Sequence, residues 1–249
     1  MASNFPVWVI NLERSKDRLA AITQDLNQHQ LPFTRLNAIS PDNSPNSYWR
    51  PEEAPRYSAH LNKREYFTSL KAGEISCFLS HQLAWKWLLA SSAPYSMVLE
   101  DDVQIISNMR GHLNAALKWL DSTEPRMLKL YSKRPIDGRV VARLTPETTI
   151  TVPRLPPLGT QAQALNRAAA KLLLQRAKEF GVPVDVFLQA KWETGVTVGV
   201  IQPPLFTEVS AATGGSTLSE KSKRKLWTTL TREFLRLRFR INRHLRARQ

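Results

Sequence analysis

Apolar and polar residues follow two different periods along the chain, which predicts an α/β protein. Short apolar runs typical of buried strands alternate with segments whose apolar residues recur three or four positions apart, as on one face of a helix. The predicted strands span residues 6–12, 33–39, 95–99, 127–131, 160–165 and 196–201, with a hairpin over residues 139–152. One predicted helix begins after Ser15. Three more span residues 74–90, 108–120 and 166–180. This strand–helix–strand order favours a mainly parallel sheet.

Loop and cap signals divide the chain further. Residues 40–56 hold four prolines and predict a long loop. Asn166 is placed to cap the start of its helix, and Gly181 to close its end in the left-handed conformation. The small, polar residues 213–219 predict a flexible connection between a domain over residues 1–219 and a tail over residues 220–249.

The last segment of the chain predicts a basic amphipathic helix. The net charge is +14, and residues 221–249, with 11 Lys and Arg and one Glu, carry +10 of it. The apolar residues of this tail recur every three or four positions: Leu226, Leu230, Phe234, Leu237, Ile241 and Leu245. Such a helix is typical of an anchor at an anionic membrane surface, where each basic residue contributes on the order of 1 kcal/mol. A nucleic-acid-binding arm and a helix packed on the domain or on another subunit are the alternatives, and we expect no nucleic acid partner.

Composition limits the compartment. The single cysteine, Cys77, excludes an intramolecular disulfide and fits a reducing compartment. The N-terminal residues lack the basic and long apolar regions of a signal peptide, and no apolar stretch approaches the ~20 residues that span a bilayer. We therefore expect a cytoplasmic protein that associates peripherally with the inner membrane.

Three carboxylates follow a predicted buried strand: Glu100, Asp101 and Asp102. Open α/β sheets bind ligands at the carboxyl ends of their strands. Because side chains alternate along an extended chain, we expect Glu100 and Asp102 on one side and Asp101 on the other. Two converging carboxylates suit a hard cation such as Mg²⁺ or Mn²⁺, which can also take diphosphate oxygens. A charged strand end facing solvent is the alternative.

Five segments, in this order, resemble glycosyltransferase family 25: VINLERSKDRL, GEISCFLSHQLAW, MVLEDDV, GTQAQALNRAAAKLL and VPVDVFL. This family includes bacterial lipopolysaccharide and lipo-oligosaccharide transferases and is similar to the transferase domains of collagen galactosyltransferases. The resemblance implies a GT-A-like fold, a UDP-sugar donor, Mn²⁺ or Mg²⁺, and inversion at the anomeric carbon. It also implies transfer of a hexose, with galactose favoured, to a lipid-linked core oligosaccharide.

The resemblance implies roles for individual residues as well. Glu100 and Asp102 are expected to hold the metal. Asp185 is expected to act as the general base for the acceptor hydroxyl, although a helix N-cap is the alternative, and Glu193 and Glu208 are weaker candidates. The remaining residues are expected around the donor: Asn11, Arg14, Arg18, Ser80, His81, Asp101, Gly159 and Thr160. A solvated helix face is the alternative for Arg14, and a core position for His81.

One segment departs from the family pattern. Residues 159–163 read Gly-Thr-Gln-Ala-Gln where the family has Gly-Thr-Gly-Ala-Tyr, so an amide replaces an aromatic ring that can stack on a sugar. Two other function classes stay open, the first because of the acidic cluster and the basic tail, the second because of this altered segment. One is a metal-dependent phosphodiesterase or nuclease whose basic tail binds nucleic acid. The other is a non-catalytic binding protein with the same fold.

Overall fold

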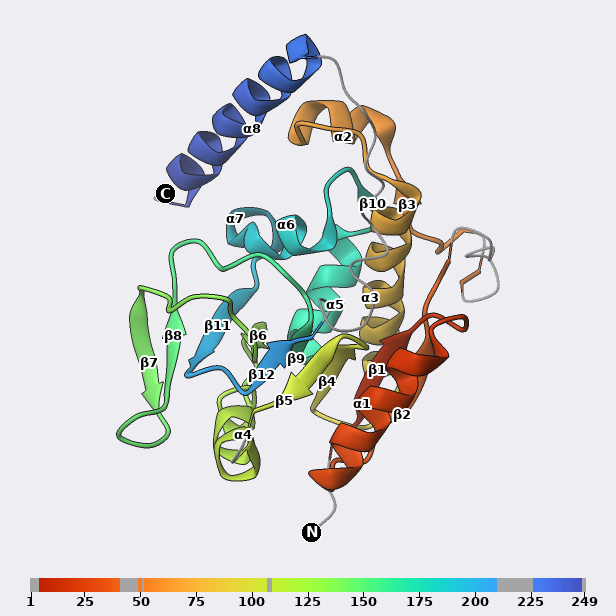
Figure 1. Ribbon diagram of the computed structural model, residues 1–249. Helices are drawn as coiled ribbons and strands as arrows, with labels where there is room; N and C mark the ends of the chain where they lie inside the picture. Colours follow the sequence, from red (N-terminus) through yellow and green to blue (C-terminus); the bar gives the residue numbers. More distant parts are fainter. Residues whose placement is uncertain (1–4, 41–48, 51, 107–108, 210–225, 248–249) are drawn as a thin grey trace.

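An eight-stranded mixed sheet runs through the centre of the computed structural model, which describes residues 5–40, 49–50, 52–106, 109–209 and 226–247 (Figure 1). Its strands are β1 (Val7–Asn11), β2 (Thr34–Asn37), β4 (Tyr95–Glu100), β6 (Arg126–Lys129), β7 (Arg139–Arg143), β8 (Thr149–Val152), β9 (Ala162–Asn166) and β11 (Thr197–Gln202). They are arranged in the order β2-β1-β4-β9-β6-β11-β8-β7. The predicted strands and the hairpin are all confirmed, with ends shifted by a few residues.

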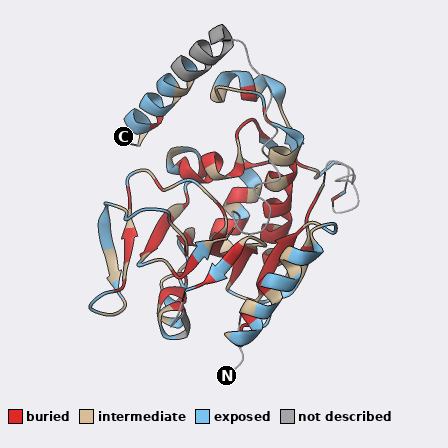
Figure 2. Ribbon diagram, viewed as in Figure 1, coloured by how far each residue is buried: buried red, intermediate tan, exposed pale blue. Residues whose placement is uncertain are grey.

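Helices cover both faces of this sheet. Helices α3 (Ala72–Ala90) and α5 (Arg167–Arg176) pack on the face that carries Trp8 and Ile10. Helices α1 (Lys16–Gln28) and α4 (Met109–Lys118) pack on the opposite face, which carries Val7 and Val9. Because successive side chains of a strand point to opposite faces, strands buried on both sides read as continuous apolar runs. Figure 2 shows the result, with buried residues concentrated along the strands and on the inner sides of the helices.

The prediction of a mainly parallel sheet is wrong. Within the described residues, the pairs β1–β2, β1–β4 and β6–β11 are parallel, and the pairs β4–β9, β6–β9, β8–β11 and β7–β8 are antiparallel. Strands β4 and β6, which flank α4 in the chain, do run in the same direction, as the strand–helix–strand pattern predicts. The space between them, however, is filled by β9, which runs the other way. The periodicity of a segment indicates that it is a strand but not which neighbours it joins.

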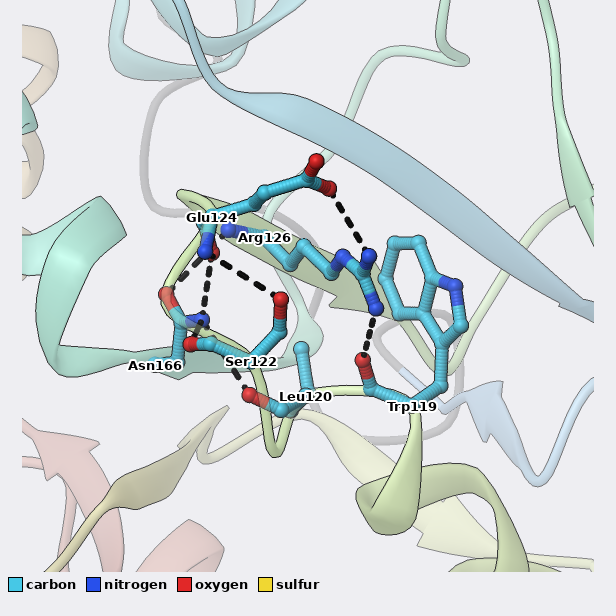
Figure 3. Close-up of polar contacts among 6 residues, drawn as sticks. All are labelled: Trp119, Leu120, Ser122, Glu124, Arg126 and Asn166. Carbon is cyan, nitrogen blue, oxygen red and sulfur yellow. Dashed lines mark hydrogen bonds and ion pairs between the residues drawn. The ribbon is translucent and has the colours of Figure 1, made fainter.

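Asn166, at the end of β9, ties together the ends of three elements (Figure 3). Its Oδ1 accepts a hydrogen bond from the backbone N–H of Ala169 at 2.9 Å, which caps α5 as predicted. The same oxygen accepts from the backbone N–H of Arg126, the first residue of β6, at 3.1 Å. Its Nδ2 lies 2.7–3.1 Å from the backbone carbonyl oxygens of Leu120, Ser122 and Glu124. A residue predicted only as a cap therefore also fixes the connection between α4 and β6.

The predicted end of the helix after Asn166 is wrong. α5 ends at Arg176, because the residues after it form β10 (Glu179–Phe180), which pairs with β3 (Arg56–Tyr57). Gly181 does not take the left-handed conformation. It permits a close approach instead, since a Cβ there would lie 2.4 Å from the backbone nitrogen of Asn62, in helix α2 (Ala59–Glu65).

The smaller elements complete the fold. Strands β5 (Val103–Ile105) and β12 (Phe206–Glu208) pair with each other, and helices α6 (Val184–Gln189) and α7 (Lys191–Thr194) precede β11. Most of the predicted proline-rich loop, the predicted connection over residues 213–219 and the domain boundary at residue 219 lie outside the described residues.

Helix α8 (Leu226–Arg246), the blue helix at the top of Figure 1, forms as predicted but turns an unexpected face inward. Arg243, 9% exposed, donates to Oε1 of Gln189 at 2.9 Å and to the carbonyl oxygen of Val186 at 2.7 Å. Its guanidinium lies over the rings of Trp192 and Phe239, 5.1 and 5.4 Å from their centroids. The helix is thus held on α6 and α7 through an arginine.

The apolar side of α8 points the other way. Leu237, Ile241 and Leu245 are 57%, 50% and 54% exposed. In the part of the helix whose side chains are described, the apolar stripe therefore does not pack on the domain, which was one of the alternatives. None of the helices in the described part of the chain has the length and apolar character needed to cross a membrane.

Candidate functional site

The three carboxylates lie at the point where β4 ends. Glu100 is the last residue of β4, and Asp101 and Asp102 form the turn that follows. The predicted alternation of side chains therefore stops at Glu100, and all three residues line one cavity of about 270 Å³. The rest of its lining is Ile10, Leu12, Arg14, Arg18, Ala38, Ile39, Gly73, Ser76, Cys77, Ser80 and His81.

Glu100 is held by two side-chain donors. Its Oε1 accepts from Oγ1 of Thr160 at 2.5 Å and lies 3.3 Å from Nε2 of His81. Burial alone would raise the pKa of Glu100, but the hydrogen bonds from His81 and Thr160 outweigh burial and lower the pKa below its usual value. Glu100 is therefore an ionised carboxylate, fixed through one of its two oxygens.

Asp101 faces the first strand and its helix. Its Oδ2 accepts from Nδ2 of Asn11 at 2.7 Å, and its Oδ1 lies 3.4 Å from Nη1 of Arg18. Burial raises the pKa of Asp101, against the hydrogen bond from Asn11 and the charge of Arg18. Asn11 in turn donates to the carbonyl oxygen of Ser15, so Asp101 fixes the acidic turn to the start of α1.

Asp102 lacks such partners. Its Oδ1 is buried and has no hydrogen-bond partner among the described residues. Burial, followed by the charges of Glu100 and Asp101, raises the pKa of Asp102 to about 7. A buried carboxylate oxygen without a donor, beside other carboxylates, suits a cation that neutralises it. The residues present therefore fit Mg²⁺ or Mn²⁺ held by Glu100 and Asp102.

A second set of possible ligands lies nearby. Ligand atoms of Cys77, His81 and Glu100 lie within 4.8 Å of one another, and a Cys–His–Glu set is more typical of Zn²⁺. Both ring nitrogens of His81 are already engaged, with Glu100 and with Gln163. Burial, and then the charges of Glu100, Asp185 and Asp102, raise the pKa of the Cys77 thiol well above its usual value, so the thiolate that binds metals is disfavoured. The carboxylate pair is the better candidate.

The reversed direction of β9 completes the site. Because β9 is antiparallel to β4, the residues that precede β9 lie beside the end of β4: Leu99 pairs with Ala162, and the backbone N–H of Glu100 donates to the carbonyl oxygen of Gln161 at 2.8 Å. This is how Thr160 reaches Glu100, 60 residues away in the chain. If β9 were parallel to β4, Thr160 would lie near the amino end of β4, away from Glu100.

Asp185 binds the segment before β9 that carries Gly159 and Thr160. Its Oδ2 accepts from the backbone N–H of Gly159 at 3.1 Å, and its Oδ1 from the N–H of Val186 at 2.8 Å. Asp185 lies in the first turn of α6, whose N-cap is Pro183, so the alternative role as an N-cap is wrong. Gly159 has a φ of +94°, which a residue with a side chain rarely adopts.

The remaining predicted residues differ in their surroundings. Ser80 is buried, donates to the carbonyl oxygen of Ser76 at 2.8 Å and accepts from the N–H of Ile39 at 2.9 Å, so it supports the wall of the cavity. Arg14 lines the cavity. Glu208, one of the weaker candidates for the base, binds the Tyr131 hydroxyl and Lys133, whereas Glu193 is exposed and pairs with Arg246 of α8.

Sequence reasoning missed two buried polar residues behind the site. Lys129 donates from Nζ to the carbonyl oxygens of Pro157 and Gly159, and burial lowers its pKa to about 8. Its signal was a lone charge in an apolar run. Gln163 is fully buried against His81, so position 163 offers no face to a sugar. The altered Gly-Thr-Gln-Ala-Gln segment was noticed, but its second amide points into the protein.

Fold and site together define a three-layer α/β protein with a carboxylate-rich cavity at the carboxyl end of parallel strands. The chain belongs to glycosyltransferase family 25: the family model described as "Glycosyltransferase family 25 (LPS biosynthesis protein)" matches residues 4–188.

Curated relatives include both transferases and proteins named inactive. Procollagen galactosyltransferase 2 of Mus musculus is 26% identical over 188 residues, which cover 73% of this chain and 29% of that protein. The lipooligosaccharide biosynthesis protein lic2B of Haemophilus influenzae is 25% identical over 181 residues, 67% of this chain and 61% of that protein. The inactive glycosyltransferase 25 family member 3 of Homo sapiens is 29% identical over 193 residues, 73% of this chain and 31% of that protein.

The chain thus matches less than a third of the length of these animal relatives. A solved structure of a glycosyltransferase involved in glycosylation of the major capsid of PBCV-1 aligns with a TM-score of 0.41 and 9% identity, over 93% of this chain and 99% of that chain. A likeness at this level carries no argument about function.

Proposed function

We propose that this protein is an inverting, metal-dependent glycosyltransferase that moves a hexose from a UDP-sugar to the core oligosaccharide of a lipopolysaccharide or lipo-oligosaccharide. The observation that carries the proposal is Asp102, whose buried Oδ1 has no hydrogen-bond partner among the described residues and lies in the same cavity as the ionised Glu100. Galactose is the favoured sugar because two relatives are named galactosyltransferases.

Different residues of the cavity would contact the metal and the phosphates of the donor. Glu100 and Asp102 would hold Mn²⁺ or Mg²⁺, which supplies charge neutralisation for the departing diphosphate. Arg14 and Arg18 line the same cavity around the start of α1, where a helix N-terminus and arginines suit phosphate oxygens. The neighbouring residues Asn11, Ser80, His81, Asp101, Gly159 and Thr160 keep these groups in place.

Asp185 is the proposed general base. The acceptor hydroxyl attacks the anomeric carbon from the face opposite the diphosphate, the bond from that carbon to the diphosphate oxygen breaks, and the hydroxyl proton passes to the Asp185 carboxylate. Asp185 is half-buried and each of its oxygens accepts one backbone N–H, which leaves a lone pair on each oxygen for the proton.

Helix α8 is proposed to bind the anionic surface of the inner membrane, where a lipid-linked acceptor would lie. Its exposed apolar residues Leu237, Ile241 and Leu245 form one side of the helix, and exposed Arg238 and Arg240 lie next to them in sequence. An apolar strip flanked by arginines suits the boundary between acyl chains and headgroups.

Titration calorimetry with UDP tests the metal-dependent site. We expect UDP affinity to fall when EDTA removes the metal, and Asp102→Asn to lose most of the metal-dependent part. Asp121→Asn, which changes an exposed aspartate just after the end of α4 and outside the cavity lining, serves as the matched control. Equal UDP affinity with and without EDTA in the wild type would refute the proposal.

A second candidate is a binding protein without turnover, because several relatives are named inactive. Release of UDP from UDP-galactose or UDP-glucose in the presence of a truncated core oligosaccharide separates the two. Metal-dependent UDP binding without UDP release from any donor would favour the binding protein. The nuclease alternative has no support in the family match.

Co-sedimentation with phosphatidylglycerol vesicles tests the membrane contact. Replacing Leu237, Ile241 and Leu245 together by serine should abolish it, while transfer to a soluble acceptor stays near the wild-type rate. Pelleting that persists in this variant, or tight RNA or DNA binding by the wild type at physiological salt, would contradict the membrane role.

A further inference from the structure

Behind the acidic turn lies a buried chain of hydrogen bonds that the proposed reaction does not use. Nε2 of Gln163 lies 3.0 Å from Nδ1 of His81, and Nε2 of His81 lies 3.3 Å from Oε1 of Glu100. Both Gln163 and His81 are 0% exposed. Water therefore does not compete for these contacts, and the proton positions are fixed by the three side chains themselves.

The chemistry of the three groups determines which nitrogen of His81 carries the proton. An ionised carboxylate can only accept hydrogen bonds, so the ring nitrogen that faces Glu100 must be a donor. In a neutral imidazole the other nitrogen, Nδ1, is then an acceptor, and it faces the amide N–H of Gln163. The arrangement is self-consistent only when His81 is protonated at Nε2.

The other end of the Gln163 amide supports a role beyond packing. Its Oε1 is buried and has no hydrogen-bond partner among the described residues. A buried acceptor without a partner lowers stability, so an apolar residue of similar shape would suit a position that only fills space. The amide is useful here for its donor.

We propose that Gln163 is a positioning residue that holds His81 in the Nε2-protonated tautomer, so that His81 and Thr160 both donate to Oε1 of Glu100 and Oε2 stays available for the divalent cation. This inference rests on the proposed metal-dependent function for the part that concerns the cation. Among the described contacts of Glu100, both side-chain hydrogen bonds go to Oε1, which agrees with this division of labour. Groups that orient a metal ligand typically change metal affinity by about 10- to 100-fold when they are removed.

The test follows the His81 ring directly. Two-dimensional ¹H–¹⁵N spectra of the full-length protein distinguish Nε2–H from Nδ1–H imidazoles, and His81→Gln identifies the His81 signals. We expect only the Nε2–H form in the wild type. Gln163→Met keeps the shape of the side chain but removes the donor, and should give a mixture of protonation forms at His81. Gln82→Met, which changes a buried glutamine of the same helix as His81, should leave the His81 signals unchanged.

Binding of Mn²⁺ alone, followed by electron paramagnetic resonance, gives the second readout. Gln163→Met should weaken Mn²⁺ binding by about tenfold, at the lower end of that range, because Gln163 acts through His81 and not on the ligand itself. Nδ1–H in the wild type, or an unchanged His81 spectrum in Gln163→Met, overturns the positioning role. If wild-type protein does not bind Mn²⁺ at all, the metal-dependent function fails, while the His81 spectrum still decides the role of Gln163. If Gln163→Met does not fold, Gln163→Leu, which also removes the donor, takes its place in both measurements.

Discussion

Arg243 holds α8 on the domain, and Arg243→Met should release the helix. Its two hydrogen bonds to the domain come from a charged donor, worth about 1.5–3 kcal/mol each, and its contact with the Trp192 ring adds about 0.5 kcal/mol. Burial opposes them, since it lowers the pKa of Arg243 from its usual value to about 10, a cost of about 3 kcal/mol. The net contribution to docking is therefore about 2 kcal/mol.

Hydrogen exchange measured by mass spectrometry can detect this change. A loss of 2 kcal/mol corresponds to about a 30-fold increase in the opening equilibrium, and a released helix of this length is marginal in water. We expect amides of residues 235–246 to exchange about 30-fold faster, with β4 unchanged. Arg240→Met alters an exposed arginine of the same helix and should have no effect. Unchanged exchange in α8, or equally faster exchange in β4, would show that Arg243 is not a local clamp.

Three other variants test the fold and the site. Asn166→Ala should lower the free energy of unfolding in urea by about 3–4 kcal/mol, because it removes a helix cap and leaves buried carbonyl groups unpaired. The control Asn114→Ala, on the exposed face of α4, should change it by less than about 0.5 kcal/mol. The free energy of unfolding of the wild type, relative to that of Lys129→Met, should rise by up to about 3 kcal/mol between pH 8 and 10.5, because only the unfolded state keeps the Lys129 proton in that range. A difference between the two proteins that does not change with pH would contradict the lowered pKa. Asp185→Asn should reduce kcat by about 10²-fold or more and retain UDP affinity, and near-normal turnover would limit Asp185 to holding Gly159.

Sequence patterns predicted the helices, strands and caps that depend on neighbouring residues in the chain. Asn166 caps a helix because of its own side chain, and the apolar spacing identifies α1, α3 and α4 without reference to the rest of the fold. The direction of β9 and the close approach at Gly181 depend on segments far away in the chain, so no period or cap indicates them. In α8 the helical periodicity is correct, but the face that contacts the domain carries Arg243, which binds two acceptors and the Trp192 ring there.

The site shows the same division. The acidic run at residues 100–102 was evident because its charges are contiguous and follow an apolar strand. The partners that decide how each carboxylate behaves are distant: His81 and Thr160 for Glu100, Asn11 and Arg18 for Asp101. The raised pKa of Asp102 arises from burial and from the neighbouring charges once these contacts exist, which sequence spacing does not reveal.

The central place of β9 also has a consequence for the order of folding. Among the described strands, β2, β1 and β4 on one side meet β6, β11, β8 and β7 on the other only through β9, which is preceded in the chain by all of them except β11. Closing contacts across 60 to 82 residues is slow compared with forming local helices and hairpins. Glu100 in the nascent chain therefore lacks the hydrogen bond from Thr160 until this strand inserts. Glu100 is therefore held by both His81 and Thr160 only in molecules in which β9 has joined the sheet.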